Sequence, residues 1–204
     1  MDYLSENCYL STLNDNNEMD LFHCGDADLD DFFHNDSIAY INQLLGKTYL
    51  YRLNTVPSNV VAAFTVSNAS IRVDDLPNSR KKKLEHDIPH RKSCRNYPAV
   101  LIGRLGVDEN FQSKHLGSEI LTFLKYWFVE PNNKTGCRFL LVDAYNSERT
   151  IEFYQRNGFK LLFGTEQQEI EYRRLKDITS LPTRIMYFDL IGLDTAVPFR
   201  NRRV

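Results

Sequence analysis

The feature that most limits the fold of this 204-residue chain is an apolar run followed by a polar turn and a helical pattern. Residues 99–107 form a nearly continuous apolar stretch, which is typical of a central strand covered on both faces. Polar residues dominate 108–115, and apolar residues at 116, 120, 121, 124 and 128 then mark one face of a helix. A buried strand that leads directly into a helix predicts a layered α/β architecture.

The rest of the carboxyl half continues this alternation. Residues 139–144 read as a second buried strand, and residues 148–157 read as a short helix. Gly158 follows at a position where a left-handed residue would end that helix. Residues 159–163 and 184–190 have the pattern of further strands.

The amino-terminal third predicts additional strands and one helix. Residues 7–13 alternate weakly, like a first strand, and residues 48–53 and 59–67 have the pattern of a hairpin with a longer loop. Between them, residues 27–45 carry apolar side chains at three- and four-residue steps, which predicts a helix. Gly46 is placed to end that helix.

Composition narrows the class of protein. Hydrophobic residues make up 42% and charged residues 25% of the chain, which suits a globular protein, and the length suits one domain over residues 1–204. The formal net charge of −2 gives no overall sign of nucleic-acid binding. No run approaches the roughly 20 apolar residues that span a bilayer, and the start of the chain lacks a basic, apolar leader. We therefore expect a cytoplasmic protein with no membrane partner.

Two segments depart from the sheet-forming pattern. Residues 74–97 carry basic clusters at 80–83 and 90–92 and little apolar content, so we expect a basic excursion, part loop and part short helix. Residues 194–204 form a tail in which Arg200, Arg202 and Arg203 lie.

The cysteines favour neither a disulfide framework nor a metal site. Cys8, Cys24, Cys94 and Cys137 form no CxxC pair and have no histidine at zinc-finger spacing. Isolated cysteines in such a chain are expected to be reduced and packed as small apolar side chains.

The turn after the first buried strand is suited to an anion. A chain that leaves a strand and enters a helix there presents several unpaired backbone N–H groups at the positive end of the helix dipole. A pyrophosphate fits such a place, and an ordinary strand-to-helix connection is an equally good reading of this segment alone. The residues of the turn are Gln112, Ser113, Lys114, His115, Leu116, Gly117 and Ser118.

This turn resembles motif A of the GNAT superfamily of N-acetyltransferases, a Gln/Arg-x-x-Gly-x-Gly/Ala turn. Gln112 takes the first position and Gly117 the last, whereas His115 stands where the family usually has a glycine. Downstream, residues 142–146 and 151–159 resemble motif B, which typically ends in "FY-x-x-x-GF". The two motifs occur in the family's order, with a helix and a strand between them.

The resemblance implies a fold and a co-substrate. It implies an α/β (α+β) fold with a central mixed, mostly antiparallel sheet, splayed between the strands of motifs A and B, and helices on both faces. It implies acetyl-CoA as the acetyl donor and no metal. The backbone of Leu105, Gly106 and Val107 would hold the pantetheine arm, and the amides of Gln112 to Gly117 would hold the pyrophosphate. Ser118 is a further residue expected to bind the coenzyme.

Two further residues acquire roles through the resemblance. Asn146 matches a position whose side chain often meets the coenzyme arm, although Asn146 or Ser147 also fits a helix N-cap. Tyr154 matches the tyrosine that protonates the departing thiolate in many relatives, although it also fits the buried face of a short helix. A phenol with a pKa near 10 is a suitable proton donor to a thiolate. His115 is expected to start the helix in helical geometry, where glycine is not needed.

The implied reaction is direct attack of a primary amine on the thioester in a ternary complex, with no covalent intermediate. A backbone N–H on the first strand would stabilise the oxyanion. Asp108, Glu109 and several upstream carboxylates are candidates for a general base, and water is another, so none is assigned.

The similarity extends over about residues 20 to 190 to one subgroup of the superfamily. Residues 22–25 and 29–33 resemble its "F-x-C-G … L-D-x-F" stretch, and residues 98–108 and 184–190 resemble its other signatures. The subgroup includes toxins that acetylate the amino acid on charged tRNA and pair with an antitoxin protein.

Three functions are therefore open. The first is acetylation of a primary amine on a small molecule, peptide or protein. The second is the toxin activity, for which basic residues at 80–95, Arg173, Arg174 and the tail would contact tRNA. The third is a non-catalytic binding module that kept the fold. The superfamily often forms dimers, which makes a homodimer a further expectation.

Overall fold

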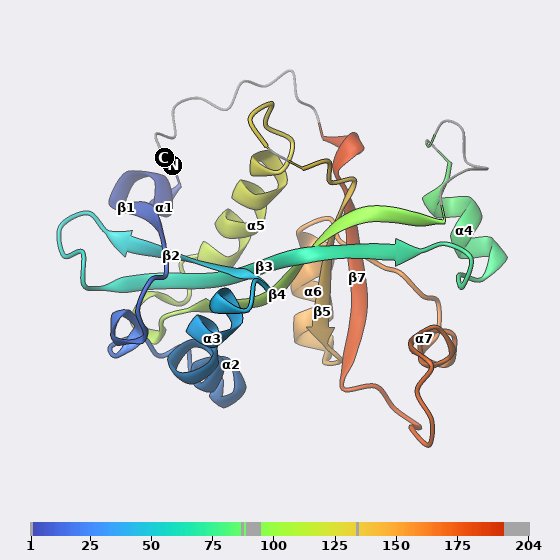
Figure 1. Ribbon diagram of the computed structural model, residues 1–204, viewed down its shortest axis with the longest axis horizontal. Helices are drawn as coiled ribbons and strands as arrows, with labels where there is room; N and C mark the ends of the chain where they lie inside the picture. Colours follow the sequence, from blue (N-terminus) through green and yellow to red (C-terminus); the bar gives the residue numbers. More distant parts are fainter. Residues whose placement is uncertain (1, 87, 89–94, 134, 194–204) are drawn as a thin grey trace. The chain divides into compact units, whose positions relative to one another are not determined.

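The computed structural model describes residues 2–86, 88, 95–133 and 135–193 (Figure 1). The chain forms two compact units. Of the described residues, unit 1 comprises 2–68, 102–131 and 193, and unit 2 comprises 69–86, 88, 95–101, 132–133 and 135–192. Strands β3 (Val60–Arg72) and β4 (Asn96–Val107) are each divided between the two units: one part of the strand belongs to unit 1 and the other part to unit 2.

Unit 1 contains four neighbouring strands in the order β1-β2-β3-β4. Strand β1 (Cys8–Thr12) pairs antiparallel with β2 (Lys47–Leu53), and β2 pairs antiparallel with β3. The predicted first strand and hairpin are thus confirmed, and β3 and β4 extend beyond the predicted 59–67 and 99–107.

Helices cover both faces of the unit 1 sheet, as side-chain alternation along β2 requires. On one face, the Tyr49 ring lies 4.9 Å from that of Trp127 in helix α5 (Leu116–Trp127). On the other face, Leu50 belongs to an apolar cluster with Phe22 and Phe33. Figure 1 shows α5 behind the strands and α2 (Ala27–Asp31) and α3 (Ser37–Asn42) in front of them.

Unit 2 contains the strand order β3-β4-β5-β7-β6. Strand β7 (Thr183–Asp189) lies between β5 (Phe139–Tyr145) and β6 (Lys160–Leu161) and pairs antiparallel with both. The predicted strand at 159–163 is confirmed only at Lys160–Leu161, whereas the strands at 139–144 and 184–190 are confirmed with shifts of one residue. The sheet is mostly antiparallel, as expected.

Unit 2 also carries helices on both faces of its strands. Helix α4 (Asn78–Leu84) and helix α7 (Glu166–Arg173) contribute Leu84 and Tyr172 to an apolar cluster that includes Tyr187 of β7. The neighbouring Phe188 points to the opposite face, where its ring lies 5.7 Å from that of Phe159, just after helix α6 (Glu148–Arg156).

A buried carboxylate attaches α7 to β7. Glu169 is 0% exposed, and its oxygens accept hydrogen bonds from Arg184 Nε at 2.8 Å and from the Ile185 N–H at 2.7 Å. Arg173 donates to the same carboxylate and also to Asp143 of β5, each at 2.7 Å. The positive charges of the two arginines are therefore balanced by the negative charges of two carboxylates within unit 2.

The predicted helix at 27–45 is interrupted and shorter. Its central residues, Phe32–Asp36, form a π-helical turn between α2 and α3, and α3 ends at Asn42. Gly46 does not end it, because the left-handed residue is Leu44, with φ 58°. Gly46 instead stands where there is no room for a side chain, because a β-carbon there would lie 2.9 Å from the Tyr40 ring.

Several short elements have no counterpart in the prediction. They are α1 (Tyr3–Asn7), α7 and the 3-10 turns Asn16–Met19, Glu109–Phe111 and Leu190–Gly192. The basic excursion contains helix α4, as expected, whereas Cys94, residues 90–92 and the tail at 194–204 lie outside the described residues. Within the described part of the chain, no helix combines the length and apolar character needed to cross a membrane.

Candidate functional site

The first group of candidate residues forms the turn between β4 and α5 in unit 1. The chain leaves β4 at Val107 and enters α5 at Leu116. Ser113 and His115 both have left-handed backbones, with φ of 65° and 59°. The prediction that His115 starts the helix in helical geometry is therefore wrong. The family's glycine at this position has a physical reason, because a left-handed backbone costs glycine least.

The left-handed turn leaves backbone donors without partners. Ser118 and Glu119 donate their N–H groups back to the His115 carbonyl, at 2.9 and 3.2 Å. Among the described residues, no hydrogen bond uses the N–H groups of residues 113–117. These groups lie at the positive end of the twelve-residue helix α5, so the turn is chemically suited to bind an anion.

The side chain of Gln112 fixes the turn from within. Its Nε2 donates to the Cys24 carbonyl at 2.8 Å and to the Val107 carbonyl at 3.1 Å. This side chain ties the start of the turn to both β4 and the amino-terminal segment. The backbone N–H of Gln112 is also engaged, because it donates to the Glu109 carbonyl at 3.4 Å.

Asp108 anchors the same region. It is 4% exposed, and its carboxylate accepts the His23 N–H at 3.2 Å and both the backbone and side-chain N–H groups of Asn110 at 3.0 Å. With its oxygens engaged in this way, Asp108 is a structural residue of the turn.

The segment 22–25 packs against the end of β4. A β-carbon on Gly106 would lie 3.2 Å from Cys24 Cβ and 3.3 Å from Phe22 Cζ, so the absence of a side chain lets this segment approach the strand. Asp30 accepts the Cys24 N–H at 2.8 Å. Desolvation would raise the pKa of Asp30, but the N–H groups of Cys24 and Gly25 outweigh it and lower that pKa.

A cation is held beside the turn. Lys114 Nζ lies 4.7 Å from the centre of the Tyr3 ring and 5.2 Å from that of Phe111. Helix α1, which carries Tyr3, is itself attached to α5, because the Glu119 carboxylate accepts the N–H groups of Tyr3 and Leu4 at 3.0 and 2.8 Å. The ammonium group is thus kept at the start of α5 without an ion pair among the described residues.

A second group of candidate residues lies in unit 2, on helix α6. Tyr154 is partly buried, and its ring lies 5.1 Å from that of Phe153 and 5.6 Å from that of Phe159. Burial raises the pKa of Tyr154 to about 12. Within the described residues, its hydroxyl makes no hydrogen bond. The phenol is therefore protonated at neutral pH and retains its proton for a ligand.

Asn146 and Ser147 precede this helix and have defined structural contacts. Asn146 Nδ2 donates to Glu166 Oε1 at 3.0 Å and to the Leu181 carbonyl at 2.8 Å. Its two side-chain protons are engaged, so Oδ1 remains as the atom that a coenzyme could use. Ser147 is the N-cap of α6, since its Oγ accepts the Thr150 N–H at 3.3 Å.

The sequence reasoning missed Glu166, Asp30 and the side-chain role of Gln112. Glu166 accepts the Leu181 N–H and the Asn146 amide, and these bonds, in that order, lower its pKa. The signal for Asp30 was present in the "L-D" of the amino-terminal stretch, but nothing in the local pattern marks Glu166.

The cysteines that the structure describes are thiols with raised pKa values. Cys8, Cys24 and Cys137 are free thiols, and burial raises their pKa values to about 11, 12 and 11. No group of three or more histidine, cysteine or carboxylate side chains suited to a metal ion occurs among the residues that the structure describes.

Comparison with known proteins defines the class. Residues 86–161, which include β4, the turn, α5, β5 and α6, match the family model described as an acetyltransferase (GNAT) domain. This part of the chain is therefore similar to a GNAT acetyltransferase domain, and the similarity supports acyltransferase activity.

Individual relatives narrow the comparison. The chain is 24% identical over 149 residues to a tRNA-acetylating toxin of Mycobacterium tuberculosis (strain ATCC 25618 / H37Rv), covering 73% of this chain and 82% of the toxin. It resembles AtaT complexed with acetyl-methionyl-tRNAfMet (TM-score 0.62, 21% identity, 90% and 95% coverage). It also resembles a tyrosine-to-phenylalanine mutant of AtaT bound to acetyl-CoA and the C-terminus of the antitoxin AtaR (TM-score 0.58, 17% identity, 91% and 94% coverage).

Proposed function

We propose that this protein transfers the acetyl group of acetyl-CoA to the α-amine of an aminoacyl-tRNA. The observation that supports acetyl-CoA as the acetyl donor is the turn at the start of α5. There, the left-handed backbones of Ser113 and His115 leave successive N–H groups unpaired. The similarity to a tRNA-acetylating toxin over 73% of the chain supports the acceptor.

We assign the coenzyme to the residues that the motifs select. The unpaired N–H groups of residues 113–117 in the turn bind the pyrophosphate, and Lys114 adds a positive charge that the rings of Tyr3 and Phe111 hold in place. The backbone of residues 105–107 binds the pantetheine arm. Asn146 contributes Oδ1, because its amide protons already bind Glu166 and the Leu181 carbonyl.

The proposed chemistry needs one proton donor and an oxyanion site. The neutral amine attacks the thioester carbonyl carbon, so that a C–N bond forms and the carbonyl oxygen becomes an oxyanion. A backbone N–H within residues 105–107 stabilises that charge. The C–S bond then breaks, and Tyr154 donates its proton to the departing thiolate. The raised pKa of Tyr154 keeps the donor protonated at every physiological pH.

We propose that water removes the proton from the attacking amine. Asp108, one of the sequence candidates for a general base, uses its carboxylate to hold His23 and Asn110. The α-amine of an aminoacyl ester is a weaker base than a lysine side chain, so a much larger fraction of it than of lysine is neutral near pH 7.

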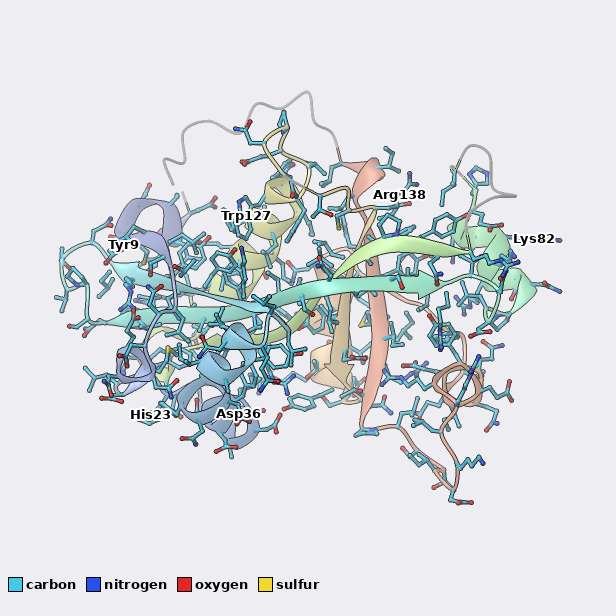
Figure 2. All side chains as sticks on the ribbon, in the orientation of Figure 1. Tyr9, His23, Asp36, Lys82, Trp127 and Arg138 are labelled. Atoms are coloured by element: carbon cyan, nitrogen blue, oxygen red, sulfur yellow. The ribbon has the colours of Figure 1, made fainter. Side chains whose placement is uncertain are left out.

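The basic helix α4 is the part of unit 2 that we assign to tRNA phosphates. Lys82 and Lys83 are exposed, and Figure 2 shows Lys82 on this helix. Arg173 is a poor candidate, because Glu169 and Asp143 already pair with its guanidinium group. A charged tRNA as acceptor implies a cytoplasmic location, and the AtaR-bound relative supports an antitoxin partner.

The test is transfer of radiolabelled acetyl from acetyl-CoA to three acceptors: total aminoacylated tRNA, the same tRNA after deacylation, and a lysine-containing peptide. We expect label in the aminoacylated tRNA alone, released by mild base as N-acetyl amino acid. Label in the peptide at a higher rate than in tRNA would identify a protein or peptide acetyltransferase instead. Label in deacylated tRNA would place the acceptor amine on a base.

A further inference from the structure

Arg104 is a charged residue on β4 that the proposed coenzyme site does not use. It precedes Gly106 by two residues, so the two share one face of the strand. Gly106 faces Phe22 and Cys24, and the Arg104 guanidinium lies 4.8 Å from the centre of the Phe32 ring. Arg104 is therefore on the α2 side of the unit 1 sheet.

The guanidinium group is held in place but poorly paired. Its Nη1 donates to the adjacent Gly103 carbonyl at 2.9 Å. Its Nε is buried and has no hydrogen-bond partner. No ion pair joins Arg104 to a carboxylate anywhere in the described residues. By contrast, Arg173 and Arg184 of unit 2 both form ion pairs with the Glu169 carboxylate.

This arrangement is suited to an anion that comes from outside the chain. A guanidinium group has five N–H donors, and hydrogen bonds within the protein engage one of those of Arg104. A buried charged donor without a partner costs stability, and a phosphate removes that cost through two parallel hydrogen bonds. Stacking on Phe32 fixes the plane of the group, so little rotamer freedom is lost when a ligand binds.

The position of Arg104 separates this anion from the coenzyme phosphates. Helix α5 packs on the face of β2 and β3 that carries Tyr49 and Phe64, through Trp127. Arg104 and Phe32 lie on the opposite face, with the cluster that contains Leu50. The pyrophosphate that we assign to the start of α5 is therefore not the partner of Arg104.

We propose that Arg104 binds a backbone phosphate at the 3′ end of the acceptor tRNA. This inference rests on the proposed function, because it requires that the amine belong to a charged tRNA. Arg104 then acts as a specificity residue: it selects an amine that is attached to a phosphodiester chain, and it takes no part in bond making.

Equilibrium binding tests the inference. We would measure the affinity of the full chain for total aminoacylated tRNA at several salt concentrations, in wild type, Arg104→Gln and Arg104→Lys. Lys47→Gln is the matched control, since Lys47 is an exposed cation of the same unit with no partner among the described residues. Thermal unfolding of each variant checks that the fold is retained.

Arg104→Gln is expected to weaken tRNA binding about tenfold, because it loses a charge-assisted bidentate contact. It should also reduce the slope of log affinity against log salt by about one counterion. Arg104→Lys should keep the slope and lose part of the affinity. Affinity for acetyl-CoA should stay within about twofold of wild type, and Lys47→Gln should change neither ligand's affinity by more than that.

A tRNA that lacks its last three nucleotides localises the phosphate. Wild type and Arg104→Gln should bind it equally. The inference is wrong if the difference between them persists with this RNA, if their salt slopes agree on intact tRNA, or if acetyl-CoA binding weakens instead. A wild-type protein that binds tRNA but acetylates only peptides would instead refute the proposed function.

Discussion

The Gln112 side chain donates a 2.8 Å hydrogen bond to the carbonyl oxygen of Cys24, a residue 88 positions earlier in the chain. Its second bond, to the Val107 carbonyl, holds the turn against the end of β4. The shape of the turn therefore depends on the amino-terminal segment as well as on its own residues. This explains how a left-handed backbone is maintained at His115, where no side-chain cap bond supports it.

The strain at His115 predicts a stabilising substitution. His115→Gly removes a β-carbon from a residue with φ of 59°, and we expect the free energy of unfolding to rise by about 0.5–1 kcal/mol. Acetyl-CoA affinity should not fall, because the backbone N–H is retained. His115→Ala keeps the β-carbon and is the control for loss of the imidazole. Urea unfolding that ranks the glycine variant below the alanine variant would show that the turn is not strained there.

Two glycines of β4 predict opposite outcomes for the same substitution. Gly106→Ala places a methyl group 3.2 Å from Cys24 and should lower the free energy of unfolding by about 1 kcal/mol. Gly103→Ala meets nothing nearer than the Thr65 carbonyl at 4.0 Å and should be neutral or slightly stabilising. Denaturant unfolding of both variants measures the difference. Equal stabilities would contradict the packing of segment 22–25 on this strand.

The buried carboxylate of Glu169 predicts a large loss of stability. Glu169→Gln leaves Arg184 without its charged partner inside unit 2, and we expect a loss of about 3 kcal/mol in the free energy of unfolding. Glu152→Gln is the control, because its ion pair with Arg156 is 3.7 Å long and exposed, and its loss should cost about 0.5 kcal/mol or less. A similar effect of the two substitutions would mean that the Glu169 cluster contributes little.

The pH dependence of Tyr154 follows from its raised pKa. The donor is active while protonated, so kcat should show no decline from this group between about pH 8 and about pH 10. In the unfolded chain it ionises near 10, and in the folded protein near 12. Its contribution to stability is therefore complete below pH 10 and is lost as pH rises toward 12. The difference in tyrosinate absorbance between wild type and Tyr154→Phe should have its midpoint near the higher value, and a midpoint near 10 would contradict it.

The periodic parts of the fold could be predicted from the sequence. The buried strands at 99–107 and 139–144 have long apolar runs, and Gly158, with φ of 81°, ends α6 where the pattern placed it. The helix at 27–45 was only partly right, because periodicity does not distinguish an α-helix from a π-helical turn at Phe32–Asp36.

The contacts that shape the site were less accessible to sequence reasoning. The motifs selected the turn, Asn146 and Tyr154, but the bond from Gln112 to Cys24 and the role of Glu166 depend on residues far apart in the chain. His115 was misread because a histidine gives no local signal of a left-handed backbone, which depends on how the turn is anchored.

Single-turnover release of CoA tests the central claim most directly. Wild-type protein would be mixed with acetyl-CoA and then with aminoacylated tRNA, and compared with Tyr154→Phe, which lacks only the phenolic oxygen. We expect one equivalent of CoA and one of N-acetylaminoacyl-tRNA from wild type, and a rate about 10²–10⁴ lower from the variant at unchanged acetyl-CoA affinity. Equal rates from the two proteins, or acetyl-CoA left unconsumed by wild type in the presence of charged tRNA, would contradict the mechanism.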